Sequence, residues 1–217
     1  MKIVGISEGF HDAALCVIRD KTIVYASQSE RYSGVKNDRW VHPSQWPVSE
    51  KHQPDVVAYY EKPFRKNLRL LCSGQKWQTP KVNYDYSFSH HESHAAAGYY
   101  TAPFDECNIL VIDAIGEWDT ISIWKAKNNV MKKIRSWKYP YSLGLLYSAI
   151  TQRIGLKPNE DEYITMGMSA FGEPKYNLEH LLWENNHKGV GDIYPNAQEN
   201  DLAASIQDLY ERELLKL

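Results

Sequence analysis

The chain has 217 residues, of which 43% are hydrophobic and 24% are charged, and its formal net charge is −2. These values are ordinary for a soluble globular protein with a sizeable core, and they exclude the basic surface that nucleic acid or a polybasic membrane patch would require. The three cysteines, Cys16, Cys72 and Cys107, are odd in number and widely separated. This argues against a disulfide framework and favours a reducing cytoplasm. No apolar run approaches the roughly 20 residues that span a bilayer, so we expect a cytoplasmic protein without a membrane partner.

Two similar successions of short strands are expected along the chain. The first trio covers residues 2–7, 13–19 and 22–29, and the second covers 108–116, 120–126 and 130–138. Tight turns join the later strands of each trio, and helical patterns follow. Between the first trio and the second, residues 55–61 (DVVAYYE) predict a buried strand of the parallel type.

Two later segments predict helices from their end signals and periodicity. Residues 142–155 predict a helix with Ser142 as N-cap and Gly155 just past its end. Residues 199–217 predict an amphipathic helix with Asn200 or Asp201 at its start.

A β-meander followed by helices, repeated twice, is the pattern of an α/β fold of the actin-like, ribonuclease-H-like type found in sugar kinases and heat-shock ATPases. In that architecture two halves face each other over a cleft, and we expect them at residues 1–106 and 107–217. The last helix should be followed by a return strand, so the second half is expected to be incomplete.

A histidine-rich stretch, SFSHHESHAAAGYY (87–100), is the strongest chemical signal. His90 and His94 lie four residues apart, so a helix places both imidazoles on one face, where two nitrogens can bind one metal ion. Asp113, at the end of the apolar strand NILVI, is the obvious third ligand, with Glu117 and Asp119 beyond it. The residues alone also allow hydrogen-bonded surface or core histidines and an aspartate that only starts a turn.

Further polar residues lie in loops that an actin-like cleft would use. His11 and Asp12 are at the tip of the first hairpin, where Gly9 allows close backbone approach. Lys36 follows the third strand and is a potential anchor for a phosphate or carbonyl oxygen. The alternatives are an ordinary polar turn and a solvated lysine. Residues 159–172 (NEDEYITMGMSAFG) predict only an acidic loop leading into a glycine-punctuated turn.

In order and spacing, four segments resemble the N-terminal domain of the O-carbamoyltransferases, the nodulation-factor and antibiotic carbamoyltransferases: residues 9–38, 90–123, 141–155 and 159–174. The resemblance implies that a C-terminal domain makes carbamoyl-adenylate from carbamoyl phosphate and ATP. The actin-like domain then passes the carbamoyl group to the hydroxyl of a small-molecule acceptor.

The resemblance also implies residue roles. A divalent metal, expected to be iron, matches His90, His94 and Asp113, while His11 and Asp12 match the loop near the carbamoyl group. The adenylate side is expected to involve Lys36, Gly116, Glu117 and Gly144. The HxxxH pair is shared with the related tRNA threonylcarbamoyl-transferase subunit, so this pair alone does not separate the two groups.

Several departures from the family pattern qualify these roles. Ala114 replaces a glycine beside Asp113, and Asp161 and Ile164 replace a glycine and a lysine of the acidic loop. The family's next strand, a fourth ligand aspartate and the adenylate-forming domain lie beyond this sequence. We therefore expect part of a split carbamoyltransferase, completed by a complementing C-terminal chain or by self-association. One alternative is a non-catalytic metal- or nucleotide-binding remnant. The other is a tRNA threonylcarbamoyl-type subunit, and the stretches SLGLLYSA and GEWDT favour the carbamoyltransferase over this second alternative.

Overall fold

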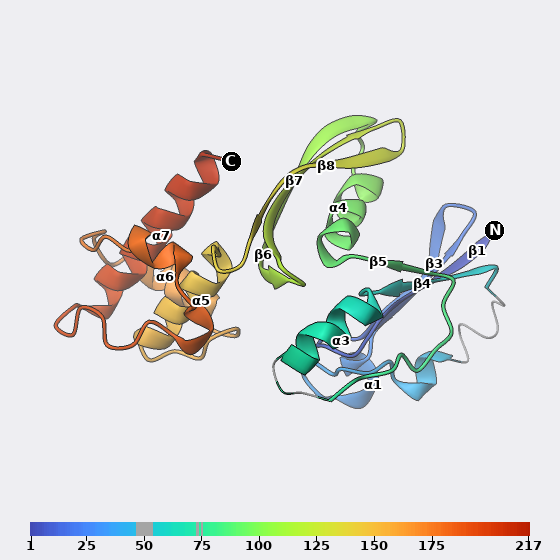
Figure 1. Ribbon diagram of the computed structural model, residues 1–217, viewed down its shortest axis with the longest axis horizontal. Coiled ribbons are helices and arrows are strands. Elements are labelled where there is room, and N and C mark those ends of the chain that lie inside the picture. The colour runs from blue at the N-terminus through green and yellow to red at the C-terminus, as the bar shows by residue number, and fades with distance from the viewer. Residues whose placement is uncertain (47–53, 73, 75) are drawn as a thin grey trace. The chain divides into compact units, whose positions relative to one another are not determined.

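The computed structural model describes residues 1–46, 54–72, 74 and 76–217 (Figure 1). These residues form two compact units, Met1–Ala97 and Gly98–Leu217. Helix α4 (His90–Thr101) contains the boundary between them. The expected division after residue 106 stays a prediction, and each unit is described by itself.

The first unit is built on a five-stranded sheet with the strand order β3-β2-β1-β4-β5. Strands β1, β2 and β3 form the expected antiparallel meander, and β4 and β5 continue the sheet in parallel. The expected strand over 55–61 is confirmed as β4, whereas the three-residue β5 was not expected. The bounds are β1 (Lys2–Ser7), β2 (Ala14–Arg19), β3 (Thr22–Gln28), β4 (Val56–Tyr60) and β5 (Tyr86–Phe88).

The core of this unit follows the period of two that a half-buried strand requires. Val4 and Ile6 of β1 and Leu15 and Val17 of β2 are 5% exposed or less, while the residues between them are more accessible. Among the described residues of this unit, the helical elements are α1 (Glu30–Ser33), the short 3₁₀ segment η1 (Pro43–Gln45), α3 (Pro63–Cys72) and the first turns of α4.

Three parallel strands of the first unit end at one edge of the sheet. Ser7 pairs with Tyr60, and Tyr60 pairs with Phe88, so β1, β4 and β5 finish in register. The loops that follow these strands therefore begin side by side. The carboxyl edge of parallel strands is where open α/β sheets bind ligands.

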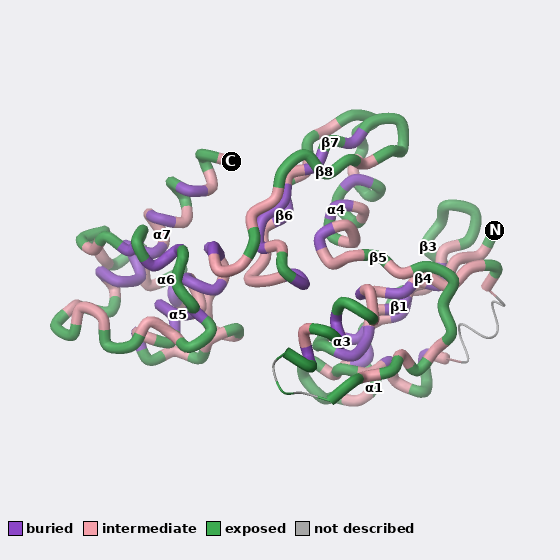
Figure 2. Tube along the Cα trace, viewed as in Figure 1, coloured by how far each residue is buried: buried purple, intermediate pink, exposed green. Residues whose placement is uncertain are grey.

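The second unit begins with an antiparallel meander of β6 (Glu106–Gly116), β7 (Asp119–Lys127) and β8 (Val130–Lys138), as expected. Helices α5 (Leu143–Arg153), α6 (Glu162–Ser169) and α7 (Glu199–Leu215) follow, with the 3₁₀ segments η2 (Glu179–Trp183) and η3 (Asn186–Lys188) between the last two. Figure 2 shows buried residues recurring along α5 and α7. Their core is apolar and includes Leu143, Leu146, Ile150, Leu202, Ile206 and Leu209.

Two helix ends agree with their sequence signals, and one prediction is wrong. The Ser142 side chain accepts a hydrogen bond from the Leu145 N–H at 3.0 Å, and Gly155 follows α5 with a φ of +83°. Helix α7 begins at Glu199, slightly before the expected start. The acidic segment expected to be a loop forms helix α6, because its Thr165 is fully buried and bonds to Thr151 of α5 at 2.8 Å. This packing outweighs the cost of Gly167 within the helix.

Across the described parts of the chain, no helix combines the length and the apolar character needed to cross a membrane.

Candidate functional site

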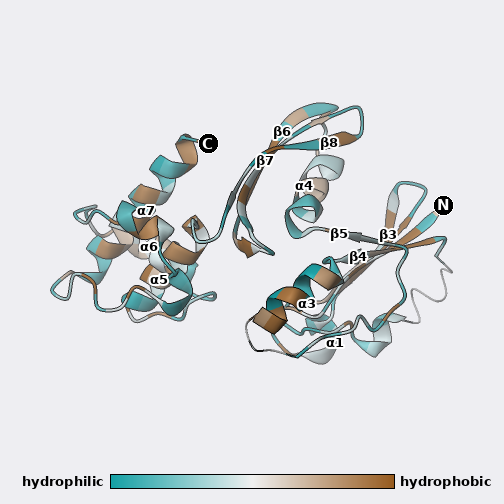
Figure 3. Cartoon of the chain, viewed as in Figure 1, coloured by the Kyte–Doolittle hydropathy of each residue, from teal (hydrophilic) through white to brown (hydrophobic). Residues whose placement is uncertain are grey.

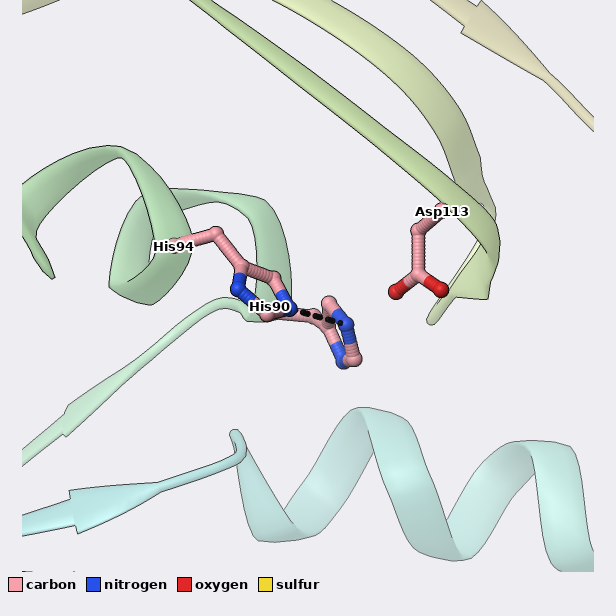
Figure 4. Close-up of side chains that lie close together, drawn as sticks. All are labelled: His90, His94 and Asp113. Atoms are coloured by element: carbon pink, nitrogen blue, oxygen red, sulfur yellow. Dashed lines mark hydrogen bonds between the residues drawn. The ribbon is translucent and has the colours of Figure 1, made fainter. Parts of the chain in front are cut away.

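The histidine pair lies at the start of α4, directly after β5. His90 is the first helical residue and His94 lies one turn further on the same face. Their Nε2 atoms are 3.0 Å apart, and Figure 4 shows the two rings joined by this hydrogen bond. Small residues follow the pair along the helix, and Ala95 among them is completely buried.

Tyr60 supports this pair from the neighbouring strand. Its hydroxyl forms a hydrogen bond with Nδ1 of His90, and the two rings meet edge to face at 5.3 Å. When the tyrosine oxygen accepts the Nδ1–H proton, the lone pair of His90 is on Nε2, the atom that faces His94. Metal-binding histidines usually have such a partner on the other ring nitrogen.

The spacing of the pair fits a shared cation. Two imidazole nitrogens that bind one ion at about 2.1 Å each lie about 3.0 Å apart when the angle between them is near 90°. The observed separation between the two Nε2 atoms is 3.0 Å. The donor set of this pair therefore fits a divalent metal ion.

Asp113 belongs to the second unit and does not end its strand, contrary to the expectation. It lies inside β6, where the ladder with β7 is interrupted between Ile112 and Gly116. The pairing with β7 resumes at Gly116, and the turn between the two strands follows Gly116. The Asp113 carboxylate, drawn in Figure 4, accepts a hydrogen bond from the Ala114 N–H at 2.7 Å. The replacement of glycine by Ala114 therefore lies in an irregular strand and not in a tight turn.

Helix α5 fixes this part of β6 from one side. The Ser142 hydroxyl donates to the Ala114 carbonyl at 2.6 Å. A Cβ atom on Gly144 would lie 2.8 Å from the Ala114 Cα and 3.1 Å from the Asp113 carbonyl carbon. Gly144 thus has a packing reason to be glycine, and its expected nucleotide role stays a prediction. Gly116 is buried at the end of β6, and Glu117 is 7% exposed with a φ of +60°. The expected nucleotide roles of these two residues also stay predictions.

The His11 loop and the Lys36 loop lie together in the first unit. His11 Nδ1 is 2.6 Å from the Asp12 carboxylate, which favours a proton on Nδ1 and leaves Nε2 as the basic atom. The loop backbone is held by the loop that carries Lys36: the Gly9 N–H donates to the Arg39 carbonyl at 2.6 Å, and the Ala13 N–H donates to that of Asp38 at 2.7 Å. The structure therefore places the two expected loops side by side.

Sequence reasoning missed a buried polar cluster at the same edge of the sheet. Glu8 and Glu61, which follow β1 and β4, are 1% and 2% exposed, and Lys66 of α3 is 6% exposed. Arg69 pairs with Glu61 at 3.2 Å. The available signal was the position of both acids directly after strand ends, which predicts neighbouring side chains only once the parallel pairing is known.

The fold places the chain in the class of actin-like α/β proteins. Over its whole length it aligns with the crystal structure of Acidaminococcus fermentans (R)-2-hydroxyglutaryl-CoA dehydratase component A, with a TM-score of 0.60 and 13% identity, covering 77% of that chain. Residues 50–217 match the family described as carbamoyltransferase N-terminus, and the chain belongs to this family. The expected fold class and family are both confirmed.

Related proteins are much longer than this sequence. An uncharacterized protein of Synechocystis, sll1178, is 33% identical over 80% of this chain, and the nodulation protein NolNO of Sinorhizobium fredii is 26% identical over 76%. These alignments cover 35% and 28% of the two proteins. The chain thus spans about a third of the length of the curated relatives it matches.

Proposed function

We propose that this chain is the acceptor-side part of an O-carbamoyltransferase, which transfers the carbamoyl group of carbamoyl-adenylate to a hydroxyl. Membership of the carbamoyltransferase N-terminus family carries this proposal. We propose that the chain works with an adenylate-forming domain, which supplies the intermediate made from carbamoyl phosphate and ATP, and a complementing C-terminal chain is one way to provide this domain. Self-association is the alternative arrangement.

We propose a metal centre formed by His90, His94 and Asp113, with iron as the expected ion. The 3.0 Å separation of the two Nε2 atoms and the hydrogen bond between Nδ1 of His90 and the Tyr60 hydroxyl support two ligands of this set. Asp113 would add a carboxylate, which suits a hard divalent cation. When bound, such an ion neutralises phosphate charge and orients the mixed anhydride.

His11 is the proposed general base. The acceptor oxygen attacks the carbamoyl carbon, its proton passes to Nε2 of His11, and the bond from that carbon to the AMP phosphate oxygen breaks. Asp12 holds the His11 tautomer through the 2.6 Å contact with Nδ1 and stabilises the imidazolium that forms. Lys36 would stabilise negative charge on the adenylate, with Gly116, Glu117 and Gly144 on the nucleotide side. AMP is a good leaving group, so positioning supplies much of the rate.

A reconstitution assay tests the proposal. The chain is purified alone and with a polypeptide that carries the adenylate-forming domain of a relative, and carbamoyl transfer from labelled carbamoyl phosphate and ATP is measured with sugars, nucleosides and tRNA as acceptors. Hydroxyl carbamoylation by the mixture, lost in His11→Ala, supports the proposal. Transfer to tRNA alone would favour a threonylcarbamoyl-type role, and a mixture that transfers to no acceptor would indicate a non-catalytic binding protein.

A further inference from the structure

Helix α3 buries two polar side chains and exposes large apolar ones. Lys66 and Asn67 are 6% and 1% exposed, whereas Phe64 and Leu68 are 70% and 51% exposed. Figure 3 shows strongly hydrophobic and hydrophilic residues alternating along this helix. Burying a polar side chain is unfavourable unless it is hydrogen-bonded. The buried side chains of α3 should therefore have specific partners.

Each buried polar side chain of α3 holds a different loop. The Asn67 side chain donates to the Gln78 carbonyl and accepts from the Gln78 N–H, both at 2.7 Å. The Lys66 ammonium donates to the Glu8 carbonyl at 3.4 Å. The two loops are also joined to each other, because the Glu8 carboxylate accepts from the Lys81 N–H at 3.1 Å. Helix α3 and these two loops thus form a closed network.

The Lys66 ammonium lies directly against Gly9. A Cβ atom on Gly9 would be 2.4 Å from Nζ, and the φ of Gly9 is +88°, a backbone conformation that residues with a side chain rarely adopt. Gly9, Tyr59, Lys66 and Gln78 also border a cavity of about 10 Å³, the room needed by one water molecule. The end of the lysine side chain therefore lies beside the glycine at the border of this small cavity.

Charge also holds Lys66 in place. Burial lowers the pKa of Lys66, and the nearby carboxylates of Glu61 and Glu8 oppose this shift by favouring the ammonium. The Glu8 carboxylate is itself 1% exposed and accepts from the Tyr59 hydroxyl at 3.3 Å. Its Oε2 has no hydrogen-bond partner among the residues that the structure describes. Removing the cation would take away a positive charge that favours the ionised form of this buried acid, while its hydrogen bonds from Tyr59 and Lys81 would remain.

We infer that Lys66 is a positioning residue for the proposed transfer, holding the backbone of Glu8 and Gly9 so that His11 keeps its orientation. The inference rests on the proposed function, because it assigns a purpose to the position of His11. The loop has a second clamp, since the Arg39 guanidinium donates to the Gly9 carbonyl at 3.4 Å. Loss of Lys66 should therefore loosen the loop without unfolding the unit.

The test compares Lys66→Met with Lys76→Met, a change at an exposed lysine shortly after the end of the same helix. Hydrogen exchange by mass spectrometry is measured on the full chain for peptides covering residues 8–13. In Lys66→Met we expect exchange there to be at least about 10-fold faster, while β6 and α5 exchange as in the wild type. In the reconstituted transfer assay kcat should fall about 10- to 100-fold with KM nearly unchanged, because misplacing a reacting group affects the chemical step. Lys76→Met should match the wild type in both measurements.

The two measurements separate the possible failures. Unchanged exchange at residues 8–13 in Lys66→Met would overturn the inference, whatever the transfer assay gives. Faster exchange with unchanged kcat would also overturn it, because the loop would then be held for stability alone. No transfer by the wild type would contradict the proposed function, while the exchange data would still decide whether Lys66 holds the loop.

Discussion

Two helical glycines of the second unit should respond in opposite ways to the same substitution. Gly144 lies in the first turn of α5, and a Cβ atom there would be 2.8 Å and 2.9 Å from the Cα and N atoms of Ala114. These are backbone atoms of β6 and cannot rotate away. Gly167 lies in α6 and is exposed, and a Cβ atom added there would have no atom of the described residues within 4 Å beyond its own helix backbone and chain neighbours.

The expected magnitudes follow from these surroundings. Replacing an exposed helical glycine by alanine stabilises a helix by about 0.5–1 kcal/mol, and Gly167→Ala should gain that amount. Overpacking a close contact costs about 1–3 kcal/mol. The gain in helix propensity from replacing glycine by alanine is smaller in the first turn than inside a helix, so it offsets only a small part of this cost. Gly144→Ala should therefore lower the free energy of unfolding by about 1–2 kcal/mol, leaving the two variants about 1.5–3 kcal/mol apart.

Urea unfolding provides the measurement, followed by hydrogen exchange on peptides of β6, α5 and α6 so that the second unit is read separately. The free energy of unfolding and its urea dependence are compared for the wild type and both variants. In Gly144→Ala, β6 peptides containing Asp113 should lose protection first. A Gly144→Ala protein as stable as Gly167→Ala would refute the close approach of α5 to β6.

Three further predictions concern single side chains. Tyr60→Phe should weaken metal binding about 10- to 100-fold, because the partner that orients His90 is lost; metal titration checks this, and unchanged affinity would speak against a supporting role. Ser142→Ala should destabilise α5 by about 1 kcal/mol through loss of its cap, measured by urea unfolding, where an unaltered midpoint would contradict the cap. Burial raises the pKa of Glu213, but hydrogen bonds such as that from Lys216 outweigh it, and the net pKa lies below the ordinary 4.5. The ionised carboxylate therefore adds stability above pH 4.5 that is lost as the pH falls through the lower folded pKa. In Glu213→Gln the free energy of unfolding should therefore fall less steeply as the pH is lowered below 4.5. A decrease as steep as that of the wild type would count against this linkage.

The parts of the fold that were predicted correctly are those with local signals. Both meanders consist of short runs of β-forming residues separated by turn residues, and Ser142 and Gly155 define the ends of α5 by their own backbone chemistry. The histidine spacing likewise predicted a shared helical face, since it depends only on helix geometry. The Nε2 contact between His90 and His94 agrees with that prediction.

The parts that were missed depend on contacts between distant segments. Helix α6 looked like a loop because of its acids and glycines, and it is stabilised by Thr165 packing on α5. The pairing of β6 is interrupted around Asp113, where α5 approaches the strand closely at Gly144. Burial of Glu8 and Lys66 follows from strand order and from the path of α3, neither of which a local pattern specifies.

Anaerobic titration of the purified chain with Fe²⁺, followed by calorimetry, tests the metal centre most directly. The wild type should bind one equivalent, His90→Ala and His94→Ala should each abolish binding, and His180→Ala, at an exposed histidine of the second unit, should bind like the wild type. Binding that persists in both His90→Ala and His94→Ala, or a wild type that binds no ion, would contradict the proposed centre.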